Sequence, residues 1–181
     1  MAATSQFFLS FSFVFLLIHG ALCIDLTQTC KKIVESTPNV NLKFCITTLQ
    51  VVPNICSIDL NDLGLISMNL SKSNATSTVR YIQKILKHKV KPYVKSCLLD
   101  CLDLYSGAIS SLDIATNDVK IEHYDEANIQ MSATIDAPTT CEDGFKERKG
   151  TKSPLSKRNG DMFQLSVIAL SIINTLSQDR I

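Results

Sequence analysis

Seven cysteines carry the most distinctive chemistry in this chain of 181 residues. In the stretch CLLDCLDLY, Cys97 and Cys101 lie four residues apart, and on a helix their Cβ atoms would be about 5–6 Å apart. A disulfide needs about 3.5–4.5 Å between Cβ atoms, so these two thiols cannot easily bond each other. A redox pair usually has the spacing Cys-x-x-Cys, which this stretch lacks.

A metal site at the same stretch would need further Cys or His ligands at short spacing. Beyond the first 23 residues the chain has only His88 and His123, and neither is paired with a neighbouring ligand. We therefore expect no metal and no cofactor. Each cysteine should instead find a disulfide partner elsewhere in the fold or stay free.

The compartment in which the chain folds decides how its cysteines behave. Residues 7–18, FFLSFSFVFLLI, form an apolar run that is too short to span a bilayer as a helix, which takes about 20 residues. A run of this length is typical of a signal-peptide core, and Ala21 and Cys23 are small residues suited to cleavage before Ile24. A retained membrane anchor is the alternative interpretation. We expect a signal peptide over 1–23 and one mature domain over 24–181, exported to a space where thiols pair.

Removal of the leader would leave six cysteines, which allow fifteen pairings: Cys30, Cys45, Cys56, Cys97, Cys101 and Cys141. Local geometry favours Cys30–Cys45, because Pro38 forms a turn between the segments that hold them. Cys101 could bond Cys141, just past the next helix, and closing that loop would contribute roughly 4 kcal/mol. Cys56 and Cys97 would remain, either as a third disulfide or as free thiols.

Other chemistry finds little support in the sequence. His88 lies in the lysine-rich run KILKHKVK, and His123 lies beside acidic residues without a recognisable nucleophile and base arrangement. No glycine-rich phosphate loop is present. The 18 basic and 17 acidic residues balance to a formal charge of +1, which gives no global field to attract nucleic acid or an anionic membrane. The pattern predicts a protein without catalytic residues.

Two sequons for N-glycosylation lie close together, at Asn69-Leu70-Ser71 and Asn74-Ala75-Thr76. In an exported protein either asparagine could carry a glycan, which would place it at the surface. We expect both where one helix gives way to the next.

The apolar periodicity is helical almost throughout, and no strand pattern of useful length is present. We expect two short helices near residues 27–38 and 42–51, and helical segments over 59–70 and 79–92. We also expect a long helix over 93–115, another over 121–137 that ends at Pro138, and a last helix over 162–176. The stretch 141–160 reads as a polar connector. The sequence therefore predicts an all-α fold, a helical bundle preceded by a helical hairpin.

Three groups of residues resemble motifs of the plant invertase and pectin methylesterase inhibitor family, in order and in spacing. They are Thr29-Cys30-Lys31-Lys32 with Ser36-Thr37-Pro38-Asn39-Val40 and Phe44-Cys45; Asp100-Cys101-Leu102-Asp103-Leu104-Tyr105; and Asn128-Ile129-Gln130-Met131-Ser132-Ala133 with Thr140-Cys141-Glu142-Asp143-Gly144-Phe145. The resemblance spans about residues 27–176 and is strongest to the pollen-allergen branch of the family.

The resemblance implies a four-helix up-and-down bundle after an N-terminal hairpin, with disulfides Cys30–Cys45 and Cys101–Cys141. It also implies a secreted protein of the cell wall, apoplast or vacuole that is not an enzyme. Such a protein binds a carbohydrate-active enzyme one to one and covers its substrate cleft. A different class of function, a carrier of small apolar ligands, would require an internal cavity.

The family has two kinds of target, and the sequence favours a pectin methylesterase over an invertase. Invertase inhibitors carry a Pro-Lys-Phe motif that enters the invertase active site, and the corresponding residues here are Val119, Lys120 and Ile121. Only the lysine is retained. Pectin methylesterase inhibitors use a distributed helical face instead, and we expect that face on the polar sides of the helices over 93–115 and 121–137.

Overall fold

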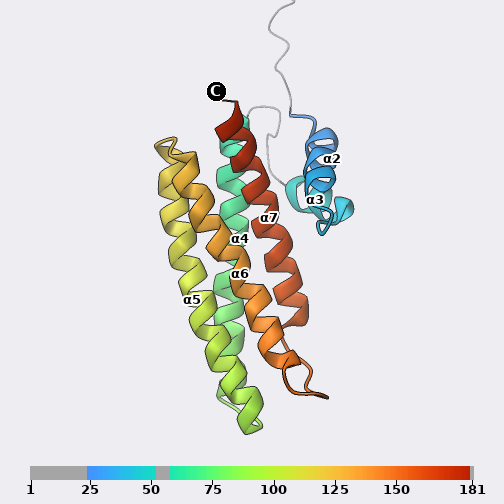
Figure 1. Ribbon diagram of the computed structural model, residues 1–181, viewed down its shortest axis with the longest axis vertical. Coiled ribbons are helices and arrows are strands. Elements are labelled where there is room, and N and C mark those ends of the chain that lie inside the picture. Colours follow the sequence, from blue (N-terminus) through green and yellow to red (C-terminus); the bar gives the residue numbers. More distant parts are fainter. Residues whose placement is uncertain (1–23, 52–57, 180–181) are drawn as a thin grey trace, which may run out of the picture.

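The computed structural model of the protein describes residues 24–51 and 58–179, and every regular element in these ranges is a helix (Figure 1). The helices are α2 (Leu26–Ser36), α3 (Leu42–Leu49), α4 (Leu60–Leu86), α5 (Pro92–Lys120), α6 (Tyr124–Lys146) and α7 (Ser156–Gln178). The long helices α4 to α7 run up and down beside one another, and the short pair α2 and α3 lies beside one end of α7. This arrangement confirms the predicted all-α fold of a four-helix bundle preceded by a hairpin.

The hairpin is defined by local sequence signals. Asp25 caps α2 by accepting a hydrogen bond from the backbone N–H of Gln28 at 3.0 Å, and Asn41 caps α3 through the N–H of Phe44 at 3.0 Å. A disulfide joins Cys30 of α2 to Cys45 of α3, with 5.8 Å between their Cα atoms. Ile33, Leu49 and other buried side chains of the pair pack on Ile168 and Ile172 of α7, so the hairpin shares a small core with the bundle.

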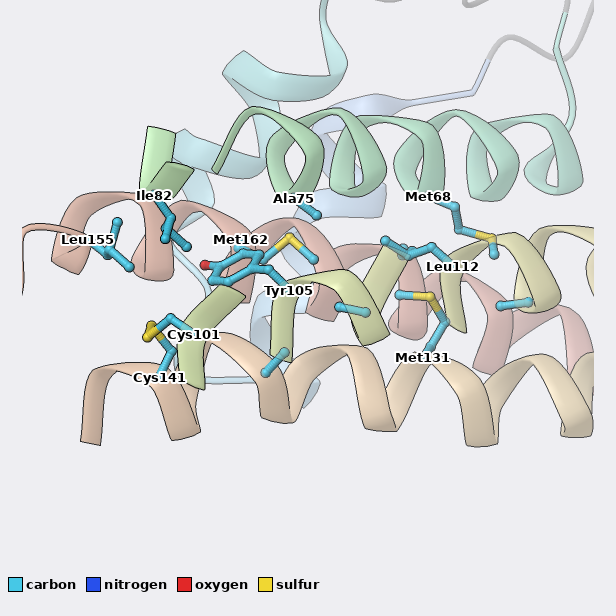
Figure 2. Close-up of a cluster of buried hydrophobic side chains, with 14 of the residues drawn as sticks. Met68, Ala75, Ile82, Cys101, Tyr105, Leu112, Met131, Cys141, Leu155 and Met162 are labelled. Atoms are coloured by element: carbon cyan, nitrogen blue, oxygen red, sulfur yellow. A yellow bond between two sulfur atoms is a disulfide. The ribbon is translucent and has the colours of Figure 1, made fainter. Parts of the chain in front are cut away.

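The bundle begins with a capping box at Asp59, whose carboxylate accepts from the N–H of Asp62 at 2.8 Å. Pro92 opens α5, where its missing N–H leaves no hydrogen bond unmade. Side chains from all four long helices fill the centre, among them Met68, Ile82, Tyr105, Leu112, Met131 and Met162 (Figure 2). Each fully buried large apolar side chain contributes roughly 1.5–3 kcal/mol. The filled interior counts against a carrier of small apolar ligands.

The helix predicted to end at Pro138 continues to Lys146, so this prediction was wrong. Pro138 lies buried inside α6, where it cannot donate a hydrogen bond to the carbonyl of Thr134, at a cost of about 3 kcal/mol. Close packing of α6 against α5 and the disulfide at Cys141 compensate for that loss. Cys141 therefore lies within the helix and not in a connector, and the polar connector shrinks to residues 147–155.

The two segments expected over 59–70 and 79–92 are one continuous helix, α4. Asn69 and Asn74 consequently lie in the middle of that helix, which corrects their predicted position at a boundary between helices. Ala75 and Ile82, which are seven residues apart, and other positions of α4 are buried. This buried stripe packs against the bundle and keeps the helix continuous through the polar stretch SKSNATST.

Helix α7 is long and apolar enough, by length and composition, to cross a membrane. Half of its apolar window is buried inside the bundle. Met162, Leu165, Ile168 and Ile172 face the other helices, as expected of a helix that packs against α4, α6 and the hairpin. Its hydropathy is therefore explained by packing.

Candidate functional site

Helices α5 and α6 are joined covalently across the face that they share. Cys101 and Cys141 form a disulfide with 4.9 Å between their Cα atoms (Figure 2). One helical turn before Cys101, Cys97 is a free and buried thiol, and its Sγ lies 3.6 Å from the carbonyl oxygen of Gly144. Of the two possibilities left open for Cys97, a third disulfide with Cys56 or a free thiol, the structure has the free thiol, which faces the backbone of α6. Cys56 lies outside the described residues.

The outer surface of this helix pair is hollowed into an open groove of about 1000 Å³. Its floor is formed by small residues on both helices, which let a partner approach the backbone closely: Gly107, Ala108 and Ser111 on α5, Ala133 and Ala137 on α6. The groove is open to solvent along its length and is lined by both helices. It can therefore receive an elongated protein segment better than it can enclose a small molecule.

Five carboxylates line this groove: Asp100, Asp103, Asp136, Asp143 and Glu147. Among these, only Asp143 forms an ion pair within the described residues, with Lys146 at 2.8 Å between Nζ and Oδ1. The hydrogen bond that the exposed Lys146 donates to Asp143 raises the pKa of this lysine. The other four carboxylates present uncompensated negative charge to whatever binds there.

Tyr93 lies at the end of the groove where α5 begins. Its phenol donates a hydrogen bond to the carbonyl oxygen of Gly144 at 2.8 Å, and the guanidinium of Arg148 lies 5.3 Å from its ring centre. Desolvation raises the pKa of this phenol, and the neighbouring Cys97 and Glu147 add to the effect. The ring is thus fixed between the two helices as a neutral hydrogen-bond donor.

The opposite end of the same face is aliphatic. Ile114 is 48% exposed, Ile129 is 69% exposed, and Ile121 in the turn between the helices is 61% exposed. Ile114 lies three residues after Ser111 and Ile129 four residues before Ala133, so both continue the groove at helical spacing. The α5/α6 face, defined by the groove and these three isoleucines, therefore carries carboxylates along the groove and exposed isoleucines toward the turn between the helices.

The residues at the invertase-inhibitor motif lie at the tip of this face. Val119 is fully buried, Lys120 is the last residue of α5 and is exposed, and Ile121 is exposed beyond it. Glu122 takes a positive φ of 61°, and His123 donates its N–H to the carbonyl of Asp118 at 2.8 Å, which closes the turn. Lys120 and Ile121 are the only two motif positions that a partner could reach.

The structure keeps the two histidines apart. His88 lies in the turn between α4 and α5, and His123 lies in the turn between α5 and α6, at opposite ends of a helix about 43 Å long. Both are exposed. Within the described residues, no three His, Cys, Asp or Glu side chains gather as a metal site would require.

The two sequon asparagines differ in their surroundings. Asn69 is exposed on α4, whereas Asn74 is only partly exposed and its Oδ1 is buried without a hydrogen-bond partner among the described residues. Glycan attachment is thus sterically open at Asn69 and restricted at Asn74.

A polar network that runs from the core to the surface between α5, α6 and α7 was not predicted from the sequence. Tyr105 donates to Asn159 at 2.8 Å, Asn159 donates to Glu142 at 2.7 Å, and Ser156 donates to the other oxygen of Glu142 at 2.6 Å. These residues lie up to 54 positions apart, so no local pattern could reveal them. The network fixes α5, α6 and the start of α7 relative to one another.

The family of the chain follows from its comparison with known proteins. The family model for the plant invertase/pectin methylesterase inhibitors matches residues 25–172. The chain belongs to this inhibitor family. Membership confirms the resemblance seen in the sequence, and it makes the protein an inhibitor of enzymes that is not itself an enzyme.

Several relatives cover nearly the whole of this inhibitor. A protein named "Putative invertase inhibitor" from Platanus orientalis is 45% identical over 93% of this chain and 98% of its own length. "Cell wall / vacuolar inhibitor of fructosidase 2" from Arabidopsis thaliana is 30% identical over 91% of this chain and 97% of its own. "Pectinesterase inhibitor 2" from the same plant is 28% identical over 91% of this chain and 93% of its own.

Solved structures of inhibitors match the fold. A mutant form of a pectin methylesterase inhibitor from Arabidopsis superposes with a TM-score of 0.68 and 27% identity, covering 78% of this chain and 95% of its own. The structure of a pectin methylesterase inhibitor from Arabidopsis thaliana gives a TM-score of 0.62 at 26% identity, over 83% of this chain and 95% of its own.

Proposed function

We propose that this inhibitor binds a secreted pectin methylesterase one to one and covers its substrate cleft with the α5/α6 face. The observation that carries the proposal is the continuous face itself, an open groove lined by uncompensated carboxylates and continued by exposed isoleucines. A face that extends along two helices suits a long polysaccharide cleft. The groove is lined by the two helices on whose polar sides we expect the contact surface, and it supports that expectation.

The rigidity of this face supports inhibition by steric blockade. The Cys101–Cys141 disulfide and the Tyr105 network hold α5 and α6 in one arrangement before any partner binds. A preorganised surface loses little conformational entropy on association, so more of the contact energy contributes to affinity. No chemical step by the inhibitor is required.

Export completes the proposal. Residues 1–23 would act as the signal peptide and residues 24–181 as the mature domain, delivered to the apoplast and cell wall, with the vacuole as a second destination. A relative named as a cell wall and vacuolar inhibitor supports this placement. The prediction for residues 1–23 lies outside the described residues.

A second candidate target is an acid invertase. Two relatives from Platanus that are 44% and 45% identical are named putative invertase inhibitors. The exposed pair Lys120 and Ile121 at the tip of the bundle could enter a narrow active site. Two observations weigh against this target. The chain lacks the proline and the aromatic residue of the motif, and Val119, which takes the place of the proline, is buried.

The test mixes the purified mature protein with a plant pectin methylesterase and, separately, with an acid invertase. We expect a dose-dependent loss of the demethylation rate and no loss of sucrose cleavage. The variant Ile129→Asp with Asp136→Lys should weaken inhibition by more than tenfold, because it reverses one charge in the groove and adds a charge to the exposed aliphatic part of the face. The control Glu35→Lys on α2, remote from α5 and α6, should inhibit normally.

The outcomes separate the two candidates. Inhibition of invertase alone, abolished by Ile121→Asp and unaffected by the change at Ile129 and Asp136, would replace pectin methylesterase as the target. Inhibition of neither enzyme would reject both targets.

A further inference from the structure

The charges of this protein, which balance over the whole chain, are separated along the bundle axis. Residues 80–95 hold six basic side chains and residues 146–158 hold six more, together 12 of the 18 in the chain. No acidic residue occurs between Asp62 and Asp100, and Glu147 is the only one in 146–158. The turn between α5 and α6, by contrast, lies among five carboxylates within residues 113–126.

The two basic segments meet at one end of the bundle. The turn from α4 to α5 and the connector from α6 to α7 both lie at the lower end in Figure 1. Side-chain contacts join them, because Arg148 of the connector lies over Tyr93 of α5 and Arg158 of α7 lies 4.4 Å from the ring centre of Tyr81 on α4. We call residues 80–95 and 146–158 together the basic end.

The lysines of the basic end are available to a ligand. Lys87, Lys89, Lys91, Lys149 and Lys152 are exposed, and none of them forms an ion pair within the described residues. Ion pairs at this end are confined to Lys146 and Lys157. So many uncompensated like charges on a small surface repel one another, and a polyanion that bridges them would relieve that repulsion.

We propose that the basic end binds acidic polysaccharide, specifically the stretches of pectin whose methyl esters have been removed. The identity of the polymer rests on the proposed function, since a pectin methylesterase converts neutral esters into a row of carboxylates. The inhibitor would then be retained where its target has already acted, with the α5/α6 face still free to bind the enzyme.

The surface chemistry favours a polycarboxylate over the other large anions. Nine of the twelve basic residues are lysines, which are compact point charges. The forked guanidinium of arginine suits phosphate better, but the guanidinium groups of Arg148 and Arg158 each lie over a tyrosine ring. The exposed large aliphatic side chains of the described residues all lie outside the basic end, although insertion into a membrane surface would need them there.

The experiment measures retention of the full mature protein on immobilised polygalacturonate, with fully methyl-esterified polymer as the neutral matrix. The test variant is Lys87→Gln/Lys89→Gln/Lys149→Gln. The matched control is Lys31→Gln/Lys32→Gln/Lys43→Gln, which removes the same number of charges from exposed lysines of the hairpin. A DNA duplex and vesicles containing an anionic lipid serve as competing probes.

We expect retention on polygalacturonate alone and elution by moderate salt. The affinity of the test variant should fall on the order of tenfold, with a shallower dependence on salt, because fewer counterions are released. The hairpin control should elute with the wild type. Equal weakening by both variants, equal retention on the esterified polymer, or tighter binding to the duplex or the vesicles would each overturn the proposal.

Enzyme assays keep this inference distinct from the proposed function. The test variant should still inhibit soluble pectin methylesterase acting on a short substrate, because Lys87, Lys89 and Lys149 do not line the groove of the α5/α6 face. Inhibition without retention on the polymer would reject the basic end as a polysaccharide site and leave the proposed function intact. Retention without inhibition of either enzyme would reject the proposed function instead.

Discussion

The phenol oxygen of Tyr105 lies 2.8 Å from Oδ1 of Asn159, and both residues are buried. This hydrogen bond links the middle of α5 to the first turn of α7 (Figure 2 shows Tyr105 beside Met162 in the core). Asn159 passes the connection on to Glu142 of α6. Three of the four bundle helices are thus positioned by one polar chain inside an apolar core.

Replacing the phenol should expose how much this chain contributes. Tyr105→Phe leaves the Oδ1 atom of Asn159 buried without its donor, which should lower the free energy of unfolding by about 1–3 kcal/mol. Tyr81→Phe is the matched control, because the Tyr81 hydroxyl makes no hydrogen bond within the described residues and its ring contact with Arg158 would persist. Urea unfolding of the disulfide-intact protein measures both changes. Equal stability of Tyr105→Phe and the wild type would contradict the role assigned to the network.

Stability should also fall at alkaline pH through the same residue. Burial raises the pKa of Tyr105 above its ordinary value near 10, and the carboxylates of Glu142 and Asp161 add to this against the opposing charge of Arg158. The folded protein therefore keeps a proton that the unfolded chain releases above about pH 10. The stabilising contribution is complete below that pH and is lost as the pH rises beyond it.

Thermal unfolding followed between pH 8 and pH 11 tests this dependence. The wild type should lose stability more steeply above pH 10 than Tyr105→Phe, which has no phenol at that position to titrate. Identical slopes for the two proteins would show that Tyr105 ionises in the folded state as readily as in the unfolded one.

The bridge between α5 and α6 should be the larger of the stabilising features. It closes a loop of 40 residues, so Cys101→Ala/Cys141→Ala should lose roughly 4 kcal/mol. The control is Cys97→Ala, which removes a buried thiol on the same face that is not cross-linked. Its free energy of unfolding should fall by no more than about 1 kcal/mol. Denaturant titration gives the comparison, and a double variant as stable as the control would refute it.

Glycosylation should discriminate between the two sequons. We predict a glycan at Asn69, which is exposed, and none at Asn74, whose side-chain oxygen is buried. In protein secreted from a plant host, Asn69→Gln should remove one glycan from the intact mass, whereas Asn74→Gln should leave the mass unchanged. A glycan that survives Asn69→Gln would place the modification at Asn74 instead.

The helical class and the order of the elements could be predicted because they depend on local spacing. Apolar residues at a helical period along α5 and α7, and the caps at Asp25 and Asn41, are readable one segment at a time. Pro138 shows where this reasoning fails. Its intrinsic preference marks a helix end, but packing against α5 outweighs that preference, and packing partners are set by the whole fold.

For the proposed contact surface, the sequence predicts which helices form it but not the chemistry of its exposed side chains. The two helices of the α5/α6 face could be identified from the sequence. The exposure of Ile114 and Ile129 near uncompensated carboxylates could not, because it depends on which side of each helix the rest of the bundle covers. The basic end escaped notice for a similar reason. The two lysine-rich stretches, 80–95 and 146–158, are more than 50 residues apart in sequence. Acidic residues elsewhere in the chain balance their charge in the net total, and the two stretches come together only when the bundle folds.

The short turn between α5 and α6 bears on how the native cross-link arises. Only residues 121–123 separate the two helices, so they can associate through contacts that are near in sequence, and such contacts form quickly. Pairing in the native register would bring Cys101 against Cys141 and leave Cys97 facing the Gly144 backbone before oxidation occurs. The early helical hairpin would thus act as a template that selects the correct thiol, although a spare cysteine lies one turn away.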